Sequence, residues 1–110
     1  MNNSIEEIKF TSKKNIISRY IFLQNCFELI QEANILGKGR EHESMHYLEY
    51  IVYKWKLDNV SIKFYIDDYS ENGWCFDITA ESKKECIEYS KKIIDFLMKN
   101  FDIKINSSKK

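Results

Sequence analysis

His42, Glu43 and His46 are the residues whose types and spacing come closest to a catalytic pattern. They follow the order H-E-x-x-H between positions 42 and 46. On a helix, two histidines four positions apart lie on one face and can bind one zinc ion, while the glutamate activates a metal-bound water. The pattern therefore raises the question of a metal site.

The sequence around these histidines argues against that chemistry. The motif resembles that of zinc metalloproteases, in which it lies on a helix that follows a sheet. Here it comes directly after 37–39, which contains two glycines, and it runs into a strand-like stretch. His42 and His46 are the only histidines, so a third ligand would have to be a glutamate such as Glu71 or Glu85. We therefore predict no metal or other cofactor, and we keep a zinc site at His42 and His46 as a remote alternative.

The cysteines do not point to nucleophilic catalysis. Cys26, Cys75 and Cys86 are an odd number without metal-type spacing, and none has a base beside it in the sequence. Cys26 and Cys86 fall on apolar helix faces, where an inert buried thiol is expected. There is also no glycine-rich phosphate loop, so the sequence predicts a protein that is not an enzyme.

Length and composition predict a single domain over residues 1–110, with 1–3 and 106–110 disordered. Hydrophobic residues make up 44% and aromatic residues 15%, which is enough for a core. Lys+Arg and Asp+Glu number 17 each, so the formal net charge is +0. This balance gives no global attraction to nucleic acid or to an anionic membrane.

The same composition predicts a cytoplasmic protein. No apolar run approaches the roughly 20 residues that cross a bilayer, and positions 1–7 lack the pattern of a secretion signal. Reduced thiols in the cytoplasm are the simplest interpretation of three cysteines. The abundance of Lys, Ile and Asn suggests an AT-rich genome, as in some bacteria and phages.

A three-stranded antiparallel meander between Tyr47 and Thr79 is the predicted centre of the fold. Apolar residues alternate in two runs, which is typical of half-buried strands: Ile51, Tyr53, Trp55 and Leu57, then Val60, Ile62, Phe64 and Ile66. Asp58-Asn59 suits a two-residue turn between them. That turn sets every apolar residue opposite another, and a slip of one residue would break the face.

The third strand of the meander is predicted from Trp74 to Thr79. Pairing Phe64 with Phe76 keeps the apolar face continuous and leaves a loop at 67–73. The same register places Lys63 beside Asp77 on the other face, which is a favourable cross-strand pair.

A long N-terminal helix is predicted from about Lys13 to Leu36, with Ser12 as N-cap and Gly37 after its end. It carries two adjacent apolar stripes, which is more than a surface helix normally buries. Either it is covered on two sides or it meets a partner, and a homodimer through this helix is one such arrangement. Arg19 lies within the apolar arc, and we expect its head to reach water.

A second helix is predicted from about Lys83 to Lys99, because Ser82 and Glu85 form a capping box. Segment 40–45 is expected to be a helical turn or irregular. The predicted class is α+β: a two-layer sandwich of N-terminal helix, three-stranded meander and C-terminal helix (αβββα). Short extra edge strands are expected around Ile8 and Phe10 and at 101–105.

This helix-strand-strand-strand-helix order, with Ser82-Lys83-Lys84 opening the last helix, resembles the double-stranded-RNA-binding domain. The resemblance covers the last third of the chain. It implies that Lys83 and Lys84 contact RNA phosphates. The family's next lysine is replaced by Ile87, and its Gly-Pro-x-His loop is missing. RNA binding is therefore the second hypothesis.

The first hypothesis is a protein contact on the uncovered sheet face. With both helices on one face, the other would present Tyr50, Val52, Lys54, Lys63, Tyr65, Cys75 and Asp77. Mixed aromatic and charged side chains suit such a contact. The neighbouring loop is acidic and carries Asp67, Asp68, Tyr69 and Glu71. We therefore predict a small binding protein that acts by stoichiometric contact, as an inhibitor or immunity-type partner of a bacterial or phage-related protein with a basic surface.

Overall fold

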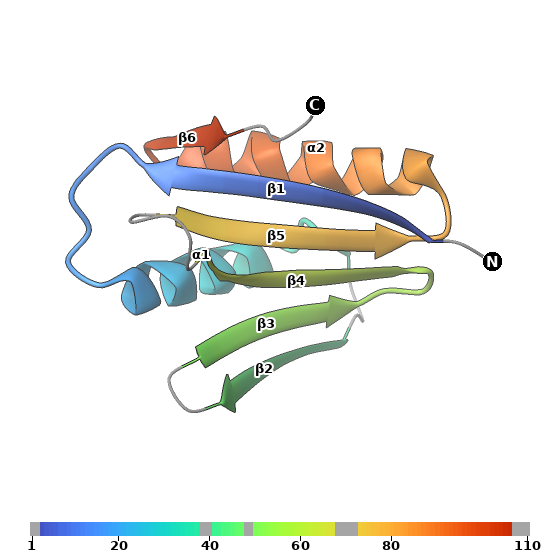
Figure 1. The fold of residues 1–110 in the computed structure, drawn as a ribbon, viewed down its shortest axis with the longest axis horizontal. Helices are drawn as coiled ribbons and strands as arrows, with labels where there is room; N and C mark the ends of the chain where they lie inside the picture. Colours follow the sequence, from blue (N-terminus) through green and yellow to red (C-terminus); the bar gives the residue numbers. More distant parts are fainter. Residues whose placement is uncertain (1–2, 38–40, 48–49, 68–72, 107–110) are drawn as a thin grey trace.

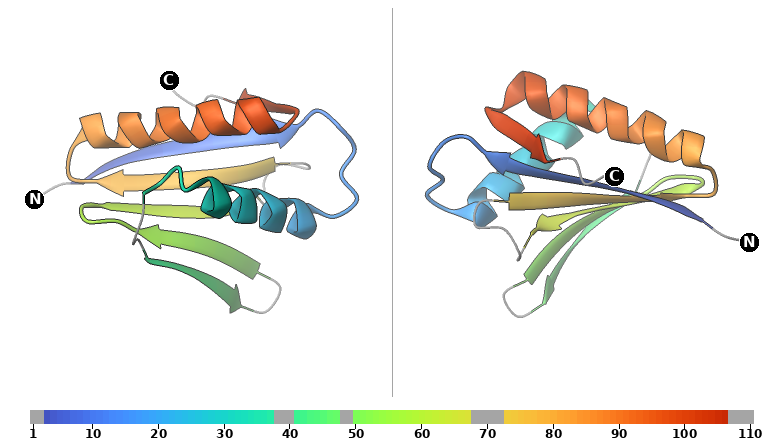
Figure 2. Two further views of the ribbon diagram at one scale, coloured as in Figure 1. Left: turned by 180° about the vertical axis from the view of Figure 1, so that it is seen from behind. Right: turned by 45° about the horizontal axis from the view of Figure 1, so that its top comes forward.

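The described part of the chain forms one six-stranded antiparallel sheet with two helices against one of its faces (Figures 1 and 2). A computed structural model describes residues 3–37, 41–47, 50–67 and 73–106, with the backbone alone for 41–47 and 50. The strands lie side by side in the order β2-β3-β4-β5-β1-β6. The elements are β1 Ser4–Ser12, α1 Arg19–Ala33, β2 Glu41–Tyr47, β3 Tyr50–Lys56, β4 Val60–Ile66, β5 Gly73–Ala80, α2 Lys83–Asn100 and β6 Ile103–Asn106.

The register of the meander β3-β4-β5 is confirmed. Tyr53 lies opposite Phe64, and Phe64 lies opposite Phe76. The Leu57 N–H donates to the Val60 carbonyl oxygen at 2.8 Å, which closes the predicted two-residue turn. Alternation of apolar and polar residues and the two-residue turn together fixed this pairing, because a slip of one residue would have placed apolar side chains in water.

The predicted order αβββα is wrong. The observed order is β-α-β-β-β-β-α-β, and both additional long strands fall where the sequence predicted something else. β1 is an interior strand of nine residues that pairs with β5 and β6, whereas a short edge strand was expected. β2 is an edge strand on β3, whereas a helical turn or an irregular link was expected there.

Helix α1 is shorter than predicted because its start uses a different serine. The Ser12 hydroxyl is engaged in a local turn, donating to the Lys14 carbonyl and accepting from the Lys14 N–H. Ser18 is the N-cap instead, and its side chain accepts from the Ile21 N–H at 3.3 Å. The helix ends at Asn34, whose left-handed backbone (φ 56°) is tolerated by asparagine.

Helix α2 is found almost where the sequence placed it. The Glu85 N–H donates to the Ser82 side-chain oxygen at 3.1 Å, which is the predicted cap. Its buried side is formed by Cys86, Ser90, Ile93 and Leu97. Ile87 and Met98 on the same helix are half exposed.

Both helices cover the same face of the sheet (Figure 2), and the core lies between them and the strands. α1 lies over β3 and β4, where Phe27 stacks on Tyr53 with ring centroids 4.0 Å apart. α2 lies over β1 and β5. The largest fully buried side chains of this core are Trp55, Trp74, Phe10, Phe64, Phe76, Leu23, Ile30, Ile62, Ile78, Ile93, Leu97 and Ile103. None of the described helices combines the length and apolar character needed to cross a membrane.

Candidate functional site

The sheet face opposite the helices, seen from the front in Figure 1, is the candidate site, and we call it the open face. The register places on it Val52, Lys54, Lys63, Tyr65, Cys75 and Asp77 from the meander. β1 adds two residues that the sequence did not predict there, because Glu7 lies opposite Asp77 and Lys9 opposite Cys75. The open face therefore spans at least four neighbouring strands.

A hydrogen-bonded cluster occupies the middle of this face. The Tyr65 hydroxyl donates to Asp77 Oδ2 at 2.7 Å. The Cys75 thiol lies 3.5 Å from Asp77 Oδ1 and donates to it. Cys75 is only 1% exposed although it lies on the face that neither helix covers. The centre of the open face is thus fixed before any partner binds.

Burial keeps the hydroxyl and the thiol of this cluster protonated. It raises the pKa of the Cys75 thiol to about 12, and the negative charge of Asp77 adds to that effect. Burial also raises the pKa of the Tyr65 hydroxyl, as do its contacts with Cys75 and Asp77. Because the thiolate is the nucleophilic form, Cys75 is not prepared for nucleophilic catalysis near neutral pH.

A row of charges crosses the open face, and its signs are grouped in pairs. Lys54 on β3 lies opposite Lys63 on β4, and Asp77 on β5 lies opposite Glu7 on β1. The two pairs adjoin where Lys63 faces Asp77, which confirms that predicted cross-strand pair. Like charges directly opposite one another destabilise a sheet. The row therefore has one positive half and one negative half.

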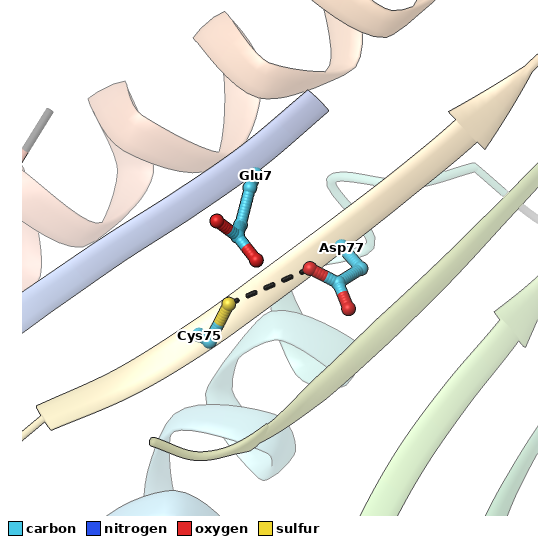
Figure 3. A group of neighbouring side chains, drawn as sticks. All are labelled: Glu7, Cys75 and Asp77. Carbon is cyan, nitrogen blue, oxygen red and sulfur yellow. Dashed lines mark hydrogen bonds between the residues drawn. The ribbon is translucent and has the colours of Figure 1, made fainter. Parts of the chain in front are cut away.

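Glu7, Cys75 and Asp77 form the one group in the described ranges that could offer three ligand atoms to a metal. Their ligand atoms lie within 4.8 Å of one another, and Figure 3 shows the Cys75 to Asp77 hydrogen bond. Zinc takes four ligands in structural sites. The next residues in register, Lys9 and Lys63, are cations rather than ligands. We therefore describe the group as a hydrogen-bonded cluster and assign it no metal.

Asp67 was predicted to belong to a solvated acidic loop, but it is buried and holds the base of that loop together. Its N–H donates to the Gly73 carbonyl oxygen at 3.0 Å, and its side chain lies 4.0 Å from Lys9 Nζ. Arg19 Nη2 donates to the carbonyl oxygens of Asp67 and Gly73, at 2.7 and 3.1 Å. We expected the Arg19 head to reach water; the structure shows that Nη2 of this head binds two backbone carbonyls and that Arg19 is partly buried.

We expect Arg19→Met to lower the free energy of unfolding by about 2 kcal/mol, since hydrogen bonds from a charged group are each stabilising by roughly 1.5–3 kcal/mol. Methionine keeps the apolar stem but leaves both carbonyls without this donor. Urea unfolding followed by circular dichroism measures the change. Lys14→Met, at an exposed position, is the control. A loss below about 0.5 kcal/mol for Arg19→Met would show that these bonds add no net stability.

The other predicted contact residues are placed only in part. Lys63 is exposed and Tyr65 is partly buried on the open face. Tyr50 begins β3, and its side chain lies outside the described atoms. Asp68, Tyr69 and Glu71 lie outside the described residues, so their role as contacts stays a prediction.

His42, Glu43 and His46 lie on β2 and not on a helix. Four positions along a strand separate two Cα atoms by about 13 Å, whereas one helical turn separates them by about 6 Å. The helical spacing required by the zinc pattern is therefore absent. Charged residues on an edge strand discourage pairing with other chains, which is a structural reason for this sequence.

Lys83 and Lys84 are exposed at the start of α2, on the helix side of the molecule. The strand order behind the resemblance to RNA-binding domains is not observed, because β1, β2 and β6 extend the meander to six strands. No protein-family model matches the chain, and no curated protein matches it significantly. The geometry of the open face must therefore carry the functional argument.

Proposed function

We propose that this protein binds another protein stoichiometrically through the open face, as an inhibitor or immunity-type partner of a bacterial or phage-related protein. The observation that supports the proposal is the grouping of like charges on a face that neither helix covers. A partner with the opposite pattern of charges would complement both halves of this row. Three free, buried cysteines suit a reducing compartment, which supports the proposal that the protein acts in the cytoplasm.

The pattern specifies what the partner presents. Glu7 and Asp77 suit lysine or arginine side chains, and the predicted contact residues Asp68 and Glu71, which lie outside the described residues, would suit a basic surface as well. Lys54 and Lys63 suit a smaller acidic group, which the partner would present beside those basic side chains. Tyr65 lies on β4 between Val52 and Cys75 of the neighbouring strands, and its hydroxyl donates to Asp77. A partly buried tyrosine in that position is the expected anchor of the contact.

Affinity capture from the native host identifies the partner, with nuclease-treated lysate as the control for RNA-mediated capture. Binding kinetics of the purified pair are then measured at two salt concentrations. We expect Glu7→Lys and Lys63→Glu each to lower the association rate about tenfold at low salt and less at high salt. Tyr65→Ala should weaken affinity by on the order of 2 kcal/mol, mainly through faster dissociation.

The matched control is Lys91→Glu on the exposed side of α2, which repeats the lysine-to-glutamate change of Lys63→Glu away from the open face. It should leave the kinetics unchanged. If the open-face variants bind like the wild type while Lys83→Ala and Lys84→Ala lose binding, the contact lies at α2. Should nuclease treatment also abolish that capture, RNA binding replaces the present proposal.

A further inference from the structure

Lys9 lies on the open face of β1 and has three carboxylates as neighbours. Glu7 lies two positions before it on the same strand, and Asp77 lies opposite Glu7 on β5. Asp67 lies on the far side of β5, directly after the end of β4. Lys9 pairs with this third carboxylate, since its Nζ atom lies 4.0 Å from Asp67 Oδ2. The lysine side chain therefore reaches across β5 to make its ion pair.

Burial gives a physical reason for this choice of carboxylate. Asp67 is only 7% exposed, whereas Glu7 is exposed and Asp77 is partly exposed. A buried carboxylate has lost hydration and needs a compensating charge, while an ion pair in water contributes little. Lys9 therefore stabilises the folded protein more beside Asp67 than beside either of the other two.

Arg19 fixes the position from which Asp67 binds Lys9. Its Nη2 donates to the carbonyl oxygens of Asp67 and Gly73, at 2.7 and 3.1 Å. The Asp67 N–H donates to the same Gly73 oxygen at 3.0 Å, so both backbone polar groups of Asp67 are bound. Arg19 is itself held, because the Trp74 side-chain N–H donates to its carbonyl oxygen at 3.2 Å. A helix residue thus sets the place of a carboxylate that acts on the open face.

We propose that Asp67 is a specificity-determining residue of the open face, because it retains Lys9 and leaves Glu7 and Asp77 to a basic partner. This inference rests on the proposed function, in which those two carboxylates form the negative half of the charge row. Without Asp67, the Lys9 ammonium is attracted to Glu7 and Asp77 and cancels part of their charge. Arg19 is then a positioning residue, since it acts on the contact through Asp67.

Crystal structures of the wild type and of Asp67→Asn test the position of Lys9 without any partner. We expect Lys9 Nζ beside Asp67 in the wild type, and within ion-pair distance of Glu7 or Asp77 in the variant. A wild-type lysine that pairs with Glu7 or Asp77 overturns the proposal. So does a lysine in Asp67→Asn that approaches neither carboxylate.

A tetra-arginine peptide is a suitable probe of the negative half, and NMR shifts of the Glu7 and Asp77 amide groups measure its Kd. We expect Asp67→Asn to raise this Kd about threefold, in line with one exposed ion pair. Adding Lys9→Gln should return the Kd to the wild-type value. Lys9→Gln alone should have a smaller effect, because Asp67 already retains Lys9 in the wild type. Equal factors in the two backgrounds would show that the charges merely add, and would overturn the proposal.

Arg19→Met tests the positioning role, because it leaves both Lys9 and Asp67 in the chain. It should raise the Kd of the probe, and Lys9→Gln should reverse that rise. A rise that Lys9→Gln does not reverse would assign Arg19 a structural role alone. The control Glu88→Gln removes one carboxylate on the exposed side of α2 and should leave the Kd unchanged.

The outcomes separate this inference from the proposed function. Circular dichroism establishes that the variants stay folded; should Asp67→Asn not fold, the wild-type crystal structure and Arg19→Met decide the question. If affinity capture yields no protein partner, the proposed function fails while the position of Lys9 is unaffected. If a captured partner responds to Glu7→Lys although Lys9 pairs with Glu7 in the wild type, the proposed function stands and the role of Asp67 is overturned.

Discussion

Phe76→Ala is expected to lower the free energy of unfolding by about 3–5 kcal/mol, because it empties the centre of the core. Phe76 is completely buried, and its ring stacks on Phe64 with centroids 4.1 Å apart and planes 2° from parallel. The rings of Phe10 and Trp55 lie 6.2 and 6.4 Å away. Rigid rings on adjacent strands cannot close the cavity, so most of the lost contact is not recovered.

Urea unfolding followed by tryptophan fluorescence and circular dichroism measures this loss. Domains of this size are stable by roughly 5–15 kcal/mol, so the variant should unfold at a much lower urea concentration. Phe76→Leu should cost less, because leucine refills part of the volume. Ile87→Ala, at a half-exposed position on α2, is the control and should cost under about 1 kcal/mol. A loss of less than about 1 kcal/mol in the free energy of unfolding for Phe76→Ala would show that the stacked rings contribute little to the stability of the core.

Alkaline pH is expected to destabilise the fold through two buried thiols. Burial raises the pKa of Cys26 and of Cys75, the latter to about 12, from an unfolded value near 9.0. An acid whose pKa is raised by folding stabilises the folded state below its unfolded pKa, and that contribution is lost as the pH rises. Above about pH 9 each thiol should remove about 1.4 kcal/mol per pH unit, or roughly 2–3 kcal/mol by about pH 11.

The slope of stability against pH separates this effect from the cost of the substitutions. Cys26→Ala and Cys75→Ala each change the free energy of unfolding at pH 7. Each should also make the decline of that free energy between about pH 9 and pH 11 shallower, by up to roughly 1.4 kcal/mol per pH unit. Tyr65→Phe should act in the same direction above about pH 10, because the pKa of the Tyr65 hydroxyl is also raised by burial. Unchanged slopes in both cysteine variants would exclude ionisation of buried thiols as the cause.

The sequence predicted those parts of the fold that depend on near neighbours. Alternation and a two-residue turn set the register of β3 and β4, and a capping box set the start of α2. β2 was not predicted, because its segment, Glu41–Tyr47, has almost no alternation of apolar and polar residues. An edge strand does not require such alternation. The start of α1 was misplaced because Ser12 and Ser18 are equally good caps in the sequence, and only the local turn at Ser12 distinguishes them.

Of the residues in the candidate site, only those on the meander were predicted from the sequence. Lys63 and Tyr65 follow from strand parity alone, and the structure places them on the expected face. Glu7 and Lys9 were missed, because alternation in β1 shows that a strand exists but not which strand it pairs with. Asp67 was assigned to a solvated loop because its partner, Arg19, is distant in the sequence and recognises a backbone carbonyl rather than a complementary side chain.

The position of β1 between β5 and β6 determines when the sheet can be completed. Ser4 pairs with Ala80 and Lys9 pairs with Asn106, so this strand joins residues that are almost a whole chain length apart. The entropy of closing such a loop grows slowly with its length and costs little equilibrium stability. The folding rate is more sensitive, because non-local pairings reward the chain only after the loop has closed. Hairpins β2-β3 and β3-β4 can form early from local contacts. We therefore expect insertion of β1 to be the late step, with the edge of β5 beside Trp74 and Phe76 open until it occurs.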